Sequence, residues 1–309
     1  MPPLHHNARR HDPAPCLVVL MMLLFTMAVP HRLLADAPAG DKTTPDSSCL
    51  QNNPSEWRWL EPGLELGCYN APGAEGSRKP DIHILRIDPD HFDFVLLNSS
   101  APGQGKRFTA KEWCRKENLV AATNTSMYQE DCRTSVSYMR SPVHTNNSYI
   151  SKDKAILAFD RRDSALPKVC IIDRDCDDFH YMKELYGTLI QSIRMISCQG
   201  NNVWEKQQKK WSAAIIGIDK NGRVLFIHVR KPFPMHDLIN ILMELPLDLK
   251  NAMYVEGGPE SQLFVQAGDI ECEFMGSYET GFLESDANFS AWPIPNVVGI
   301  RRIGGDENR

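Results

Sequence analysis

The sequence predicts an α+β fold, with a mixed and mainly antiparallel sheet, flanking helices and stabilising disulfide bonds. Three features of the 309 residues support this expectation. Short apolar runs are separated by turn residues, two segments between such runs have a helical pattern, and nine cysteines occur. No internal repeat or low-complexity tract is visible, so one large domain is expected.

The beginning of the chain has the pattern of a secretory signal peptide. A polar, basic start precedes the apolar run at 16–29, and Ala35-Asp36-Ala37 offers small residues for signal peptidase. The run is shorter than the roughly 20 apolar residues of a membrane anchor, which is the alternative. We expect a signal peptide at 1–37, a flexible polar lead-in at 38–56 and one domain at 57–309.

Charge and hydropathy exclude two classes of partner. The net charge is −5 and basic residues are not concentrated anywhere, so no nucleic acid is expected as a partner. No second long apolar stretch follows the leader, so no membrane association is expected after cleavage. The expected location is secreted or extracytoplasmic, which in a bacterium means the periplasm or cell envelope.

The cysteines favour disulfides. Loss of Cys16 with the leader leaves eight of the nine, an even set typical of exported proteins, and 105 pairings stay open. A metal site is the alternative, but the chain has no CxxC and no paired Cys/His spacing, so no metal is expected. The candidates are Cys49, Cys68, Cys114, Cys132, Cys170, Cys176, Cys198 and Cys272.

The first half of the domain predicts strands and one capped helix. Residues 81–87 and 92–98 flank a turn-rich break and are expected to pair as a β-hairpin. Thr109 and Glu112 form a capping box, so a helix is expected from there to about Asn118. Buried strands are expected at 119–124 and 155–160.

The second half predicts a hairpin, a helix and further strands. Residues 213–219 and 223–229 surround Asn221-Gly222, the strongest short-range hairpin signal. An amphipathic helix is expected near 237–245, where Pro246 ends it. A buried strand at 252–255 and a closing strand at 296–303 complete the pattern.

The sharpest feature is YVEGGPESQLFV, residues 254–265. A buried strand there ends in Glu256, and Gly257 and Gly258 follow as a turn without side chains. Such glycines let a ligand approach the backbone and expose N–H groups to an anion. The alternative is an ordinary turn between strands, which spacing alone favours.

Three blocks, in order, resemble the phosphodiester glycosidase family (N-acetylglucosamine-1-phosphodiester α-N-acetylglucosaminidase-like) over residues 81–303. Residues 121–128 (AATNTSMY) are similar to its strand-to-loop motif Asn-x-Gly-(Phe/Met)-Phe. Residues 213–226 (AAIIGIDKNGRVLF) resemble its Arg-Thr-Ala-x-Gly hairpin. Residues 251–265 resemble the segment ending in Asp-Gly-Gly-Gly-Ser-Ser.

The resemblance implies a site, with departures. Glu256 stands where the family usually has Asp and is expected to act as acid/base or nucleophile, with Asn124 beside it. Pro259 and Glu260 replace a Gly and a Ser of the turn, and Ala213 replaces an arginine that suits phosphate. These departures mark a divergent member of the family.

The missing guanidinium needs a substitute, because a sugar-1-phosphodiester is cleaved best with a cation on its phosphate. Arg194 is the first choice and Arg140 the second, although an arginine in an apolar segment is more often salt-bridged. The catalytic set is therefore Glu256, Asn124 and Arg194. The expected substrate-binding residues are Arg140, Gln191, Ser192, Gly257, Gly258, Glu260 and Ser261.

Two further patterns carry alternatives. Asn124 begins a glycosylation sequon, as do Asn98, Asn146 and Asn288. Asp173, Asp175 and Asp177 alternate ahead of Glu184 as in a calcium loop, but Asp178 stands where such a loop needs Gly. A solvated acidic loop is therefore favoured over calcium, and no other cofactor is expected.

These observations lead to two functional hypotheses. The first is an exported hydrolase that cleaves the glycosidic bond of a sugar-1-phosphodiester on a sugar-phosphate or glycan substrate. The alternative is a non-catalytic carbohydrate- or glycopolymer-binding protein on the same fold, which the absence of an arginine at Ala213 favours.

Overall fold

The computed structural model describes residues 57–71 and 81–304. The predicted signal peptide, the predicted polar lead-in and Cys49 lie outside these residues. Among the helices described there is none long and apolar enough to cross a membrane.

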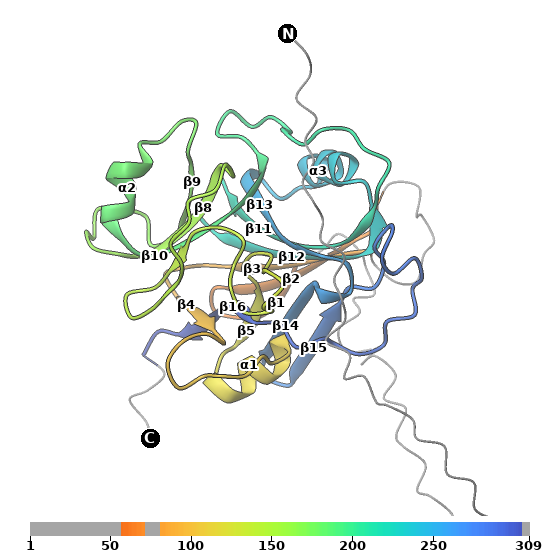
Figure 1. Ribbon diagram of the computed structural model, residues 1–309, viewed down its shortest axis with the longest axis horizontal. Helices are drawn as coiled ribbons and strands as arrows, with labels where there is room; N and C mark the ends of the chain where they lie inside the picture. The colour runs from red at the N-terminus through yellow and green to blue at the C-terminus, as the bar shows by residue number, and fades with distance from the viewer. Residues whose placement is uncertain (1–56, 72–80, 305–309) are drawn as a thin grey trace, which may run out of the picture. The chain divides into compact units, whose positions relative to one another are not determined.

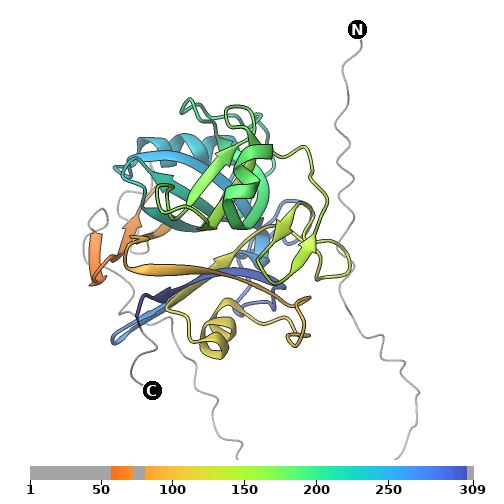
Figure 2. The same ribbon diagram turned by 90° about the vertical axis from the view of Figure 1, so that its left-hand side faces the viewer.

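Two antiparallel sheets form the framework of the described chain, which is visible in two layers in Figure 2. The larger sheet has the order β1 (Trp57–Glu61), β2 (Leu64–Tyr69), β3 (Ile82–Ile87), β12 (Val224–Phe233), β11 (Trp211–Asp219), β13 (Leu249–Gly257), β10 (Tyr186–Ile196), β6 (Met139–Arg140) and β7 (Thr145–Asn147). β8 (Ala155–Arg161) also pairs with β10, and β9 (Cys170–Asp173) pairs with β8. The smaller sheet has the order β15 (Ile270–Met275), β14 (Gln262–Ala267), β5 (Ala121–Asn124), β16 (Asn296–Arg302) and β4 (Phe92–Asn98).

The main hydrophobic core lies between the two sheets. It contains Ile216 and Phe226 from the larger sheet and Leu263 and Val298 from the smaller one, all fully buried. Burial of this apolar surface is the main driving force for the sheets to pack together.

Two helices cover the outer faces (Figure 1). α3 (Met235–Glu244) buries Leu238 and Leu242 against the larger sheet, and α1 (Ala110–Glu117) buries Trp113 against the smaller one. A third helix, α2 (Phe179–Leu185), packs near β9 and β10. These helices are short, so the described chain is mainly β, and the predicted balance of an α+β fold is corrected on this point.

Local signals predicted their elements well. Thr109 caps α1 by accepting a hydrogen bond from the Glu112 N–H, the Glu112 carboxylate accepts one from the Thr109 N–H, and Asn118 ends the helix with φ +53°. β11 and β12 form the expected hairpin, with Gly222 at φ +83° in the turn. The predicted capping box and the Asn-Gly hairpin are therefore confirmed.

The hairpin predicted for residues 81–98 is wrong. Both strands form, but β3 pairs with β2 and β12, whereas β4 pairs with β16 in the other sheet. The turn at 88–91 therefore carries the chain from one sheet to the other. Nearby residues indicated a turn, but the partners of each strand are set by residues far along the chain.

The disulfide prediction is confirmed for Cys176 and Cys198, which are bonded, and Cys272 is also in a disulfide. The prediction is wrong for Cys114 and Cys170, which are thiols in the described part of the chain, and it stays a prediction for Cys68 and Cys132. Cys114 shows the physical reason, because it lies on the buried face of α1 among apolar side chains and serves as a small core residue.

A pair of buried histidines lies between the sheets. His83 and His228 are directly opposite each other on β3 and β12, and Phe274 of β15 stacks on His83 at 4.1 Å between ring centroids. Burial lowers the pKa of His83 to about 4 and that of His228 to about 3. Both rings are therefore neutral at pH 7.

Replacement of His228 by Leu should make the fold less sensitive to acid. The folded pKa values lie below the unfolded value of 6.5, so between pH 6.5 and 4 the unfolded chain binds more protons. The wild type should therefore lose free energy of unfolding on acidification, by up to about 3 kcal/mol per histidine. Urea denaturation at pH 7 and pH 4.5 measures the difference, with exposed His180→Leu as control. Equal pH dependence in wild type and His228→Leu would contradict this assignment.

Candidate active site

The end of β13 carries a β-bulge that sets the direction of Glu256. Ala214 of β11 pairs with Glu256, but the next residue, Ile215, pairs with Tyr254, so Val255 is an extra residue. Ala214 also pairs with His228, and cross-strand neighbours point to the same face of a sheet. Glu256 therefore points toward the layer between the sheets, and bulges of this kind often re-aim a side chain at a functional site.

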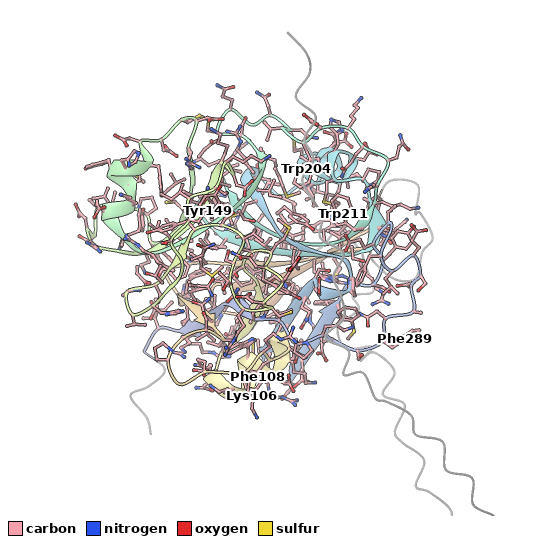
Figure 3. The ribbon with its side chains drawn as sticks, in the orientation of Figure 1. Lys106, Phe108, Tyr149, Trp204, Trp211 and Phe289 are labelled. Carbon is pink, nitrogen blue, oxygen red and sulfur yellow. A yellow bond between two sulfur atoms is a disulfide. The ribbon has the colours of Figure 1, made fainter. Side chains whose placement is uncertain are left out.

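The glycines after Glu256 are required by close packing. A Cβ on Gly257 would lie 2.7 Å from Trp211 Cδ1, and one on Gly258 would lie 2.6 Å from Glu279 Oε2. Gly258 also has φ +63°, a conformation that favours glycine. Trp211 lies near Trp204 on the side of the molecule that carries α3 (Figure 3), and both rings pack edge-on against Tyr254.

Three glutamates gather at this turn. The side chain of Glu256 is buried, and its Oε1 accepts a hydrogen bond of 3.1 Å from the Gly257 N–H. Burial, and then the negative charges of Glu260 and Glu279, raise the pKa of Glu256 well above its usual value. Glu256 therefore holds its proton at a pH where an exposed glutamate is ionised.

Glu260 lies in a different environment. It belongs to the 3₁₀ turn η2 (Gly258–Glu260), and Tyr128 Oη donates a hydrogen bond of 2.8 Å to its Oε1. Burial raises the pKa of Glu260, but the Tyr128 hydrogen bond and the positive charge of Arg107 act in the opposite direction. The pKa of Glu260 is still raised, since Glu279 adds to the effect of burial, but Tyr128 and Arg107 stabilise its ionised form.

Asn124 fastens this turn to the smaller sheet. Its Nδ2 donates to the Glu260 carbonyl at 3.0 Å, and its Oδ1 accepts from the Gln262 N–H at 2.7 Å. Asn124 and the Glu256 turn, predicted to form one site, are thus held together. The amide uses both of its ends to position the backbone.

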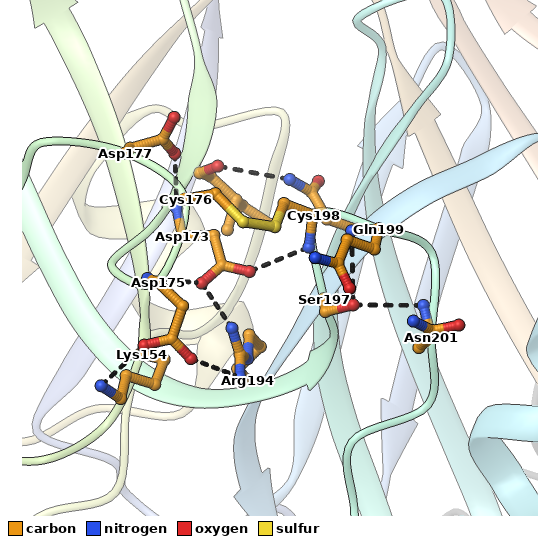
Figure 4. The surroundings of a disulfide bond; sticks show 12 residues. Lys154, Asp173, Asp175, Cys176, Asp177, Arg194, Ser197, Cys198, Gln199 and Asn201 are labelled. Atoms are coloured by element: carbon orange, nitrogen blue, oxygen red, sulfur yellow. Dashed lines mark hydrogen bonds and ion pairs between the residues drawn. A yellow bond between two sulfur atoms is a disulfide. The ribbon is translucent and has the colours of Figure 1, made fainter.

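Arg194 does not lie with them. One terminal nitrogen contacts Asp173 Oδ1 at 2.5 Å and the other contacts Asp175 Oδ2 at 2.9 Å, beside the Cys176–Cys198 disulfide (Figure 4). Asp173 is buried, so the arginine is held as its counter-ion. The prediction that Arg194 binds phosphate is therefore corrected, and the salt-bridged alternative describes its position.

Four of the expected substrate-binding residues also make hydrogen bonds within the protein. Arg140 donates to the carbonyl oxygens of residues 183 and 186, and Gln191 ties the 138 and 151–153 segments together. Ser192 donates to the Tyr254 carbonyl at 2.5 Å, and Ser261 donates to the Gly258 carbonyl at 2.9 Å. These side chains hold neighbouring segments of the backbone in place, and their expected role in substrate binding stays a prediction.

Sequence reasoning missed Tyr128, Glu279 and Arg107. Tyr128 closes the block AATNTSMY, so its place in that block was an available signal. Glu279 and Arg107 lie in irregular segments without a motif, and only the folded chain places their charges near Glu260. Ala213 is fully buried opposite Gly257 in the core beneath α3.

The acidic residues at the end of β9 and after it accept hydrogen bonds from backbone N–H groups close to them. Asp173 accepts from the Asp175 and Cys198 N–H groups, Asp177 accepts from the Asp173 N–H, and Asp175 pairs with Lys154 and Arg194. In the described residues the group with metal-like spacing is Asp173, Cys176 and Cys198, whose two sulfurs are bonded to each other. These contacts are those of an acidic loop neutralised by protein cations.

The sequons are poor glycan acceptors in the folded chain. Asn98, Asn124 and Asn288 are buried, and Asn146 donates to Ser100 Oγ at 2.7 Å.

A cavity of about 290 Å³ opens between the end of β4 and the 141–144 loop. Its lining includes Leu96, Asn98 and His144 but no residue of the Glu256 turn.

Comparison with solved structures defines the class of fold. The catalytic domain of zebrafish N-acetylglucosamine-1-phosphodiester α-N-acetylglucosaminidase, auto-inhibited by its pro-peptide, matches with a TM-score of 0.54 and 15% identity, over 81% of this chain and 87% of that one. A hypothetical protein from Synechocystis matches with a TM-score of 0.52 and 12% identity, over 80% of this chain and 64% of that one. At these identities the likeness shows a shared fold.

The sequence itself gives the family. The profile of the phosphodiester glycosidase family matches residues 117–301, so the chain belongs to that family. The expected resemblance is therefore confirmed. No curated protein matches the sequence.

Replacement of Gly258 by Ala should destabilise the fold more than the same change at Gly268. Both glycines have positive φ, +63° and +55°, so both variants carry a similar backbone cost of about 1 kcal/mol. Only Gly258 faces Glu279, while a Cβ on Gly268 meets nothing within 4 Å. We expect an extra loss of about 1–3 kcal/mol in urea denaturation. Equal losses would show that the turn has room beside Glu279.

Proposed function

We propose that this protein is a hydrolase that cleaves the bond between the anomeric carbon and the phosphate oxygen of a sugar-1-phosphodiester. The observation that carries the proposal is the pair of carboxylates at the turn after β13, the buried Glu256 and the half-buried Glu260, whose charges act on each other. Burial raises the pKa of both, but only Glu260 has a tyrosine hydroxyl and an arginine that stabilise its ionised form, and such a difference suits an acid and a base in one site. Membership of the phosphodiester glycosidase family supports the reaction type.

The roles follow from the surroundings of each carboxylate. Glu256 retains a proton because it is buried and near two negative charges, so we assign it as the acid. Glu260 accepts a hydrogen bond from Tyr128 and is near Arg107, so we assign its ionised form as the base. Asn124 positions Glu260 through the backbone of the turn.

The proposed reaction is a hydrolysis with balanced proton transfers. A water oxygen attacks the anomeric carbon and gives its proton to Glu260, while the bond to the phosphate oxygen breaks. As this bond breaks, Glu256 gives its proton to the oxygen of the leaving phosphate monoester, which is only weakly basic and so needs little assistance. Proton return from Glu260 to Glu256 through solvent completes the cycle.

The substrate class is taken from the family and its structural relative. The zebrafish relative is named for an N-acetylglucosamine-1-phosphodiester, so such a diester is the first compound to test. We also propose that residues 1–37 are removed as a signal peptide, and that the exported chain consists of a polar lead-in at 38–56 and one domain at 57–309. The Cys176–Cys198 disulfide supports an oxidising compartment.

Two observations favour the alternative of a carbohydrate-binding protein without turnover. Ala213 leaves no guanidinium beside Gly257, and the side chain of Glu256 has little exposed surface. A protein that kept this fold and lost turnover would still bind the sugar. Kinetic measurement on the purified protein distinguishes the two functions.

Replacement of Glu256 by Gln should lower kcat/KM for an N-acetylglucosamine 1-(methyl phosphate) diester by about 100-fold or more. Because the pKa of Glu256 is raised, wild-type activity should fall as pH rises through that value, when the acid loses its proton. The variant should lack this alkaline limb. Release of the sugar, measured between pH 4 and pH 9, checks both expectations.

The matched control is Glu273→Gln. Glu273 lies on β15 and also has a pKa raised by burial, but it pairs with Lys111, away from the turn. It should keep wild-type activity. A wild type that binds the sugar without releasing product would rule out the hydrolase and favour the binding protein.

A further inference from the structure

We propose that Arg107 binds the phosphate group of the diester and replaces the arginine that is absent at Ala213. This inference rests on the proposed function and extends it to the charged half of the substrate. It concerns a residue in the irregular segment ahead of α1, far in sequence from the hairpin where the family motif has its arginine.

Backbone contacts fix this segment beside the catalytic turn. The N–H of Phe108 donates to the Ile294 carbonyl at 3.4 Å, and the Ile294 N–H donates to the Phe108 carbonyl at 2.9 Å. The Ala110 N–H donates to Gln262 Oε1 at 2.9 Å, and Gln262 begins β14 two residues after Glu260. The segment that contains Arg107 is therefore fastened to the start of β14, close to the turn that carries the base.

The guanidinium of Arg107 is available for a ligand. It forms no ion pair or hydrogen bond with any other residue in the described part of the chain. By contrast, Arg194 pairs with two aspartates, and Arg230 donates to the carbonyl oxygens of residues 275 and 288. Arg107 is half-buried, so a bound anion would be partly shielded from water.

The electrostatics of the site require such a cation. Glu260 and Glu279 lie beside Glu256, where a negatively charged phosphodiester must approach, and their negative charges would repel it. The positive charge of Arg107 already acts on Glu260. A guanidinium can donate two parallel hydrogen bonds to two phosphate oxygens, and it would also stabilise the charge that develops on the leaving group.

Arg107→Gln should separate charged from neutral substrates. For the N-acetylglucosamine 1-(methyl phosphate) diester, we expect KM to rise at least 10-fold. For the neutral 4-nitrophenyl α-N-acetylglucosaminide, which has the same sugar, KM should stay within about two-fold, whatever change in kcat follows from the effect of Arg107 on Glu260. Arg107→Lys should restore part of the loss, because an ammonium keeps the charge without the fork.

The matched control is Lys106→Gln, which removes the same charge one residue away on an exposed side chain beside Phe108 (Figure 3). It should leave KM for both substrates unchanged. Equal losses on both substrates in Arg107→Gln, with a shifted pH profile, would show that Arg107 only tunes Glu260, and this would overturn the proposal. An unchanged KM for the diester would also overturn it.

A binding measurement keeps this test separate from the proposed function. Calorimetry with N-acetylglucosamine 1-phosphate and with N-acetylglucosamine needs no turnover. Phosphate-dependent affinity that is lost in Arg107→Gln and kept in Lys106→Gln supports the phosphate site, even if the wild type hydrolyses nothing. Equal binding of N-acetylglucosamine 1-phosphate by wild type and Arg107→Gln overturns it, even if the wild type is an active hydrolase.

Discussion

The side-chain amide of Asn124 is the contact on which the candidate site depends. It binds one carbonyl and one N–H of the turn that leads from β13 to β14, and so joins the last residue of β5 to the chain as it passes from the larger sheet to the smaller one. A buried amide with both ends satisfied resists displacement, because an unpaired partner would lose a hydrogen bond without gaining one from water. Glu260 is carried on this turn, and its position relative to Glu256 follows from it.

The layer between the sheets contains an unusual line of polar groups. His83, His228 and Glu256 face this layer in one cross-strand row, with Ala214 between His228 and Glu256. Burial in this layer favours the neutral forms of all three side chains. The histidines thus weaken the fold toward acid pH, whereas a protonated glutamate weakens it toward alkaline pH.

The sequence predicted what short-range physics determines, and it failed where distant residues decide. The capping box at Thr109 and the Asn-Gly turn at residues 221–222 act within a few residues, and both were recovered. The proposed pairing of residues 81–87 with 92–98 failed, because each strand found a partner in a different sheet. The Asn124 and Glu256 blocks were recognised from motif order, but the ion pair of Arg194 with Asp173 and the proximity of Arg107 to Glu260 require the folded chain.

The position of β16 has a consequence for how the protein is made. This strand is the last in the described chain, yet it lies inside the smaller sheet, where Asn296 pairs with Asn98 and Val297 pairs with Asn124. β4 and β5 can therefore be joined only after β16 has been synthesised. Pairing between such distant segments slows folding, and the edges of β4 and β5 that face β16 stay unpaired until that strand is in place.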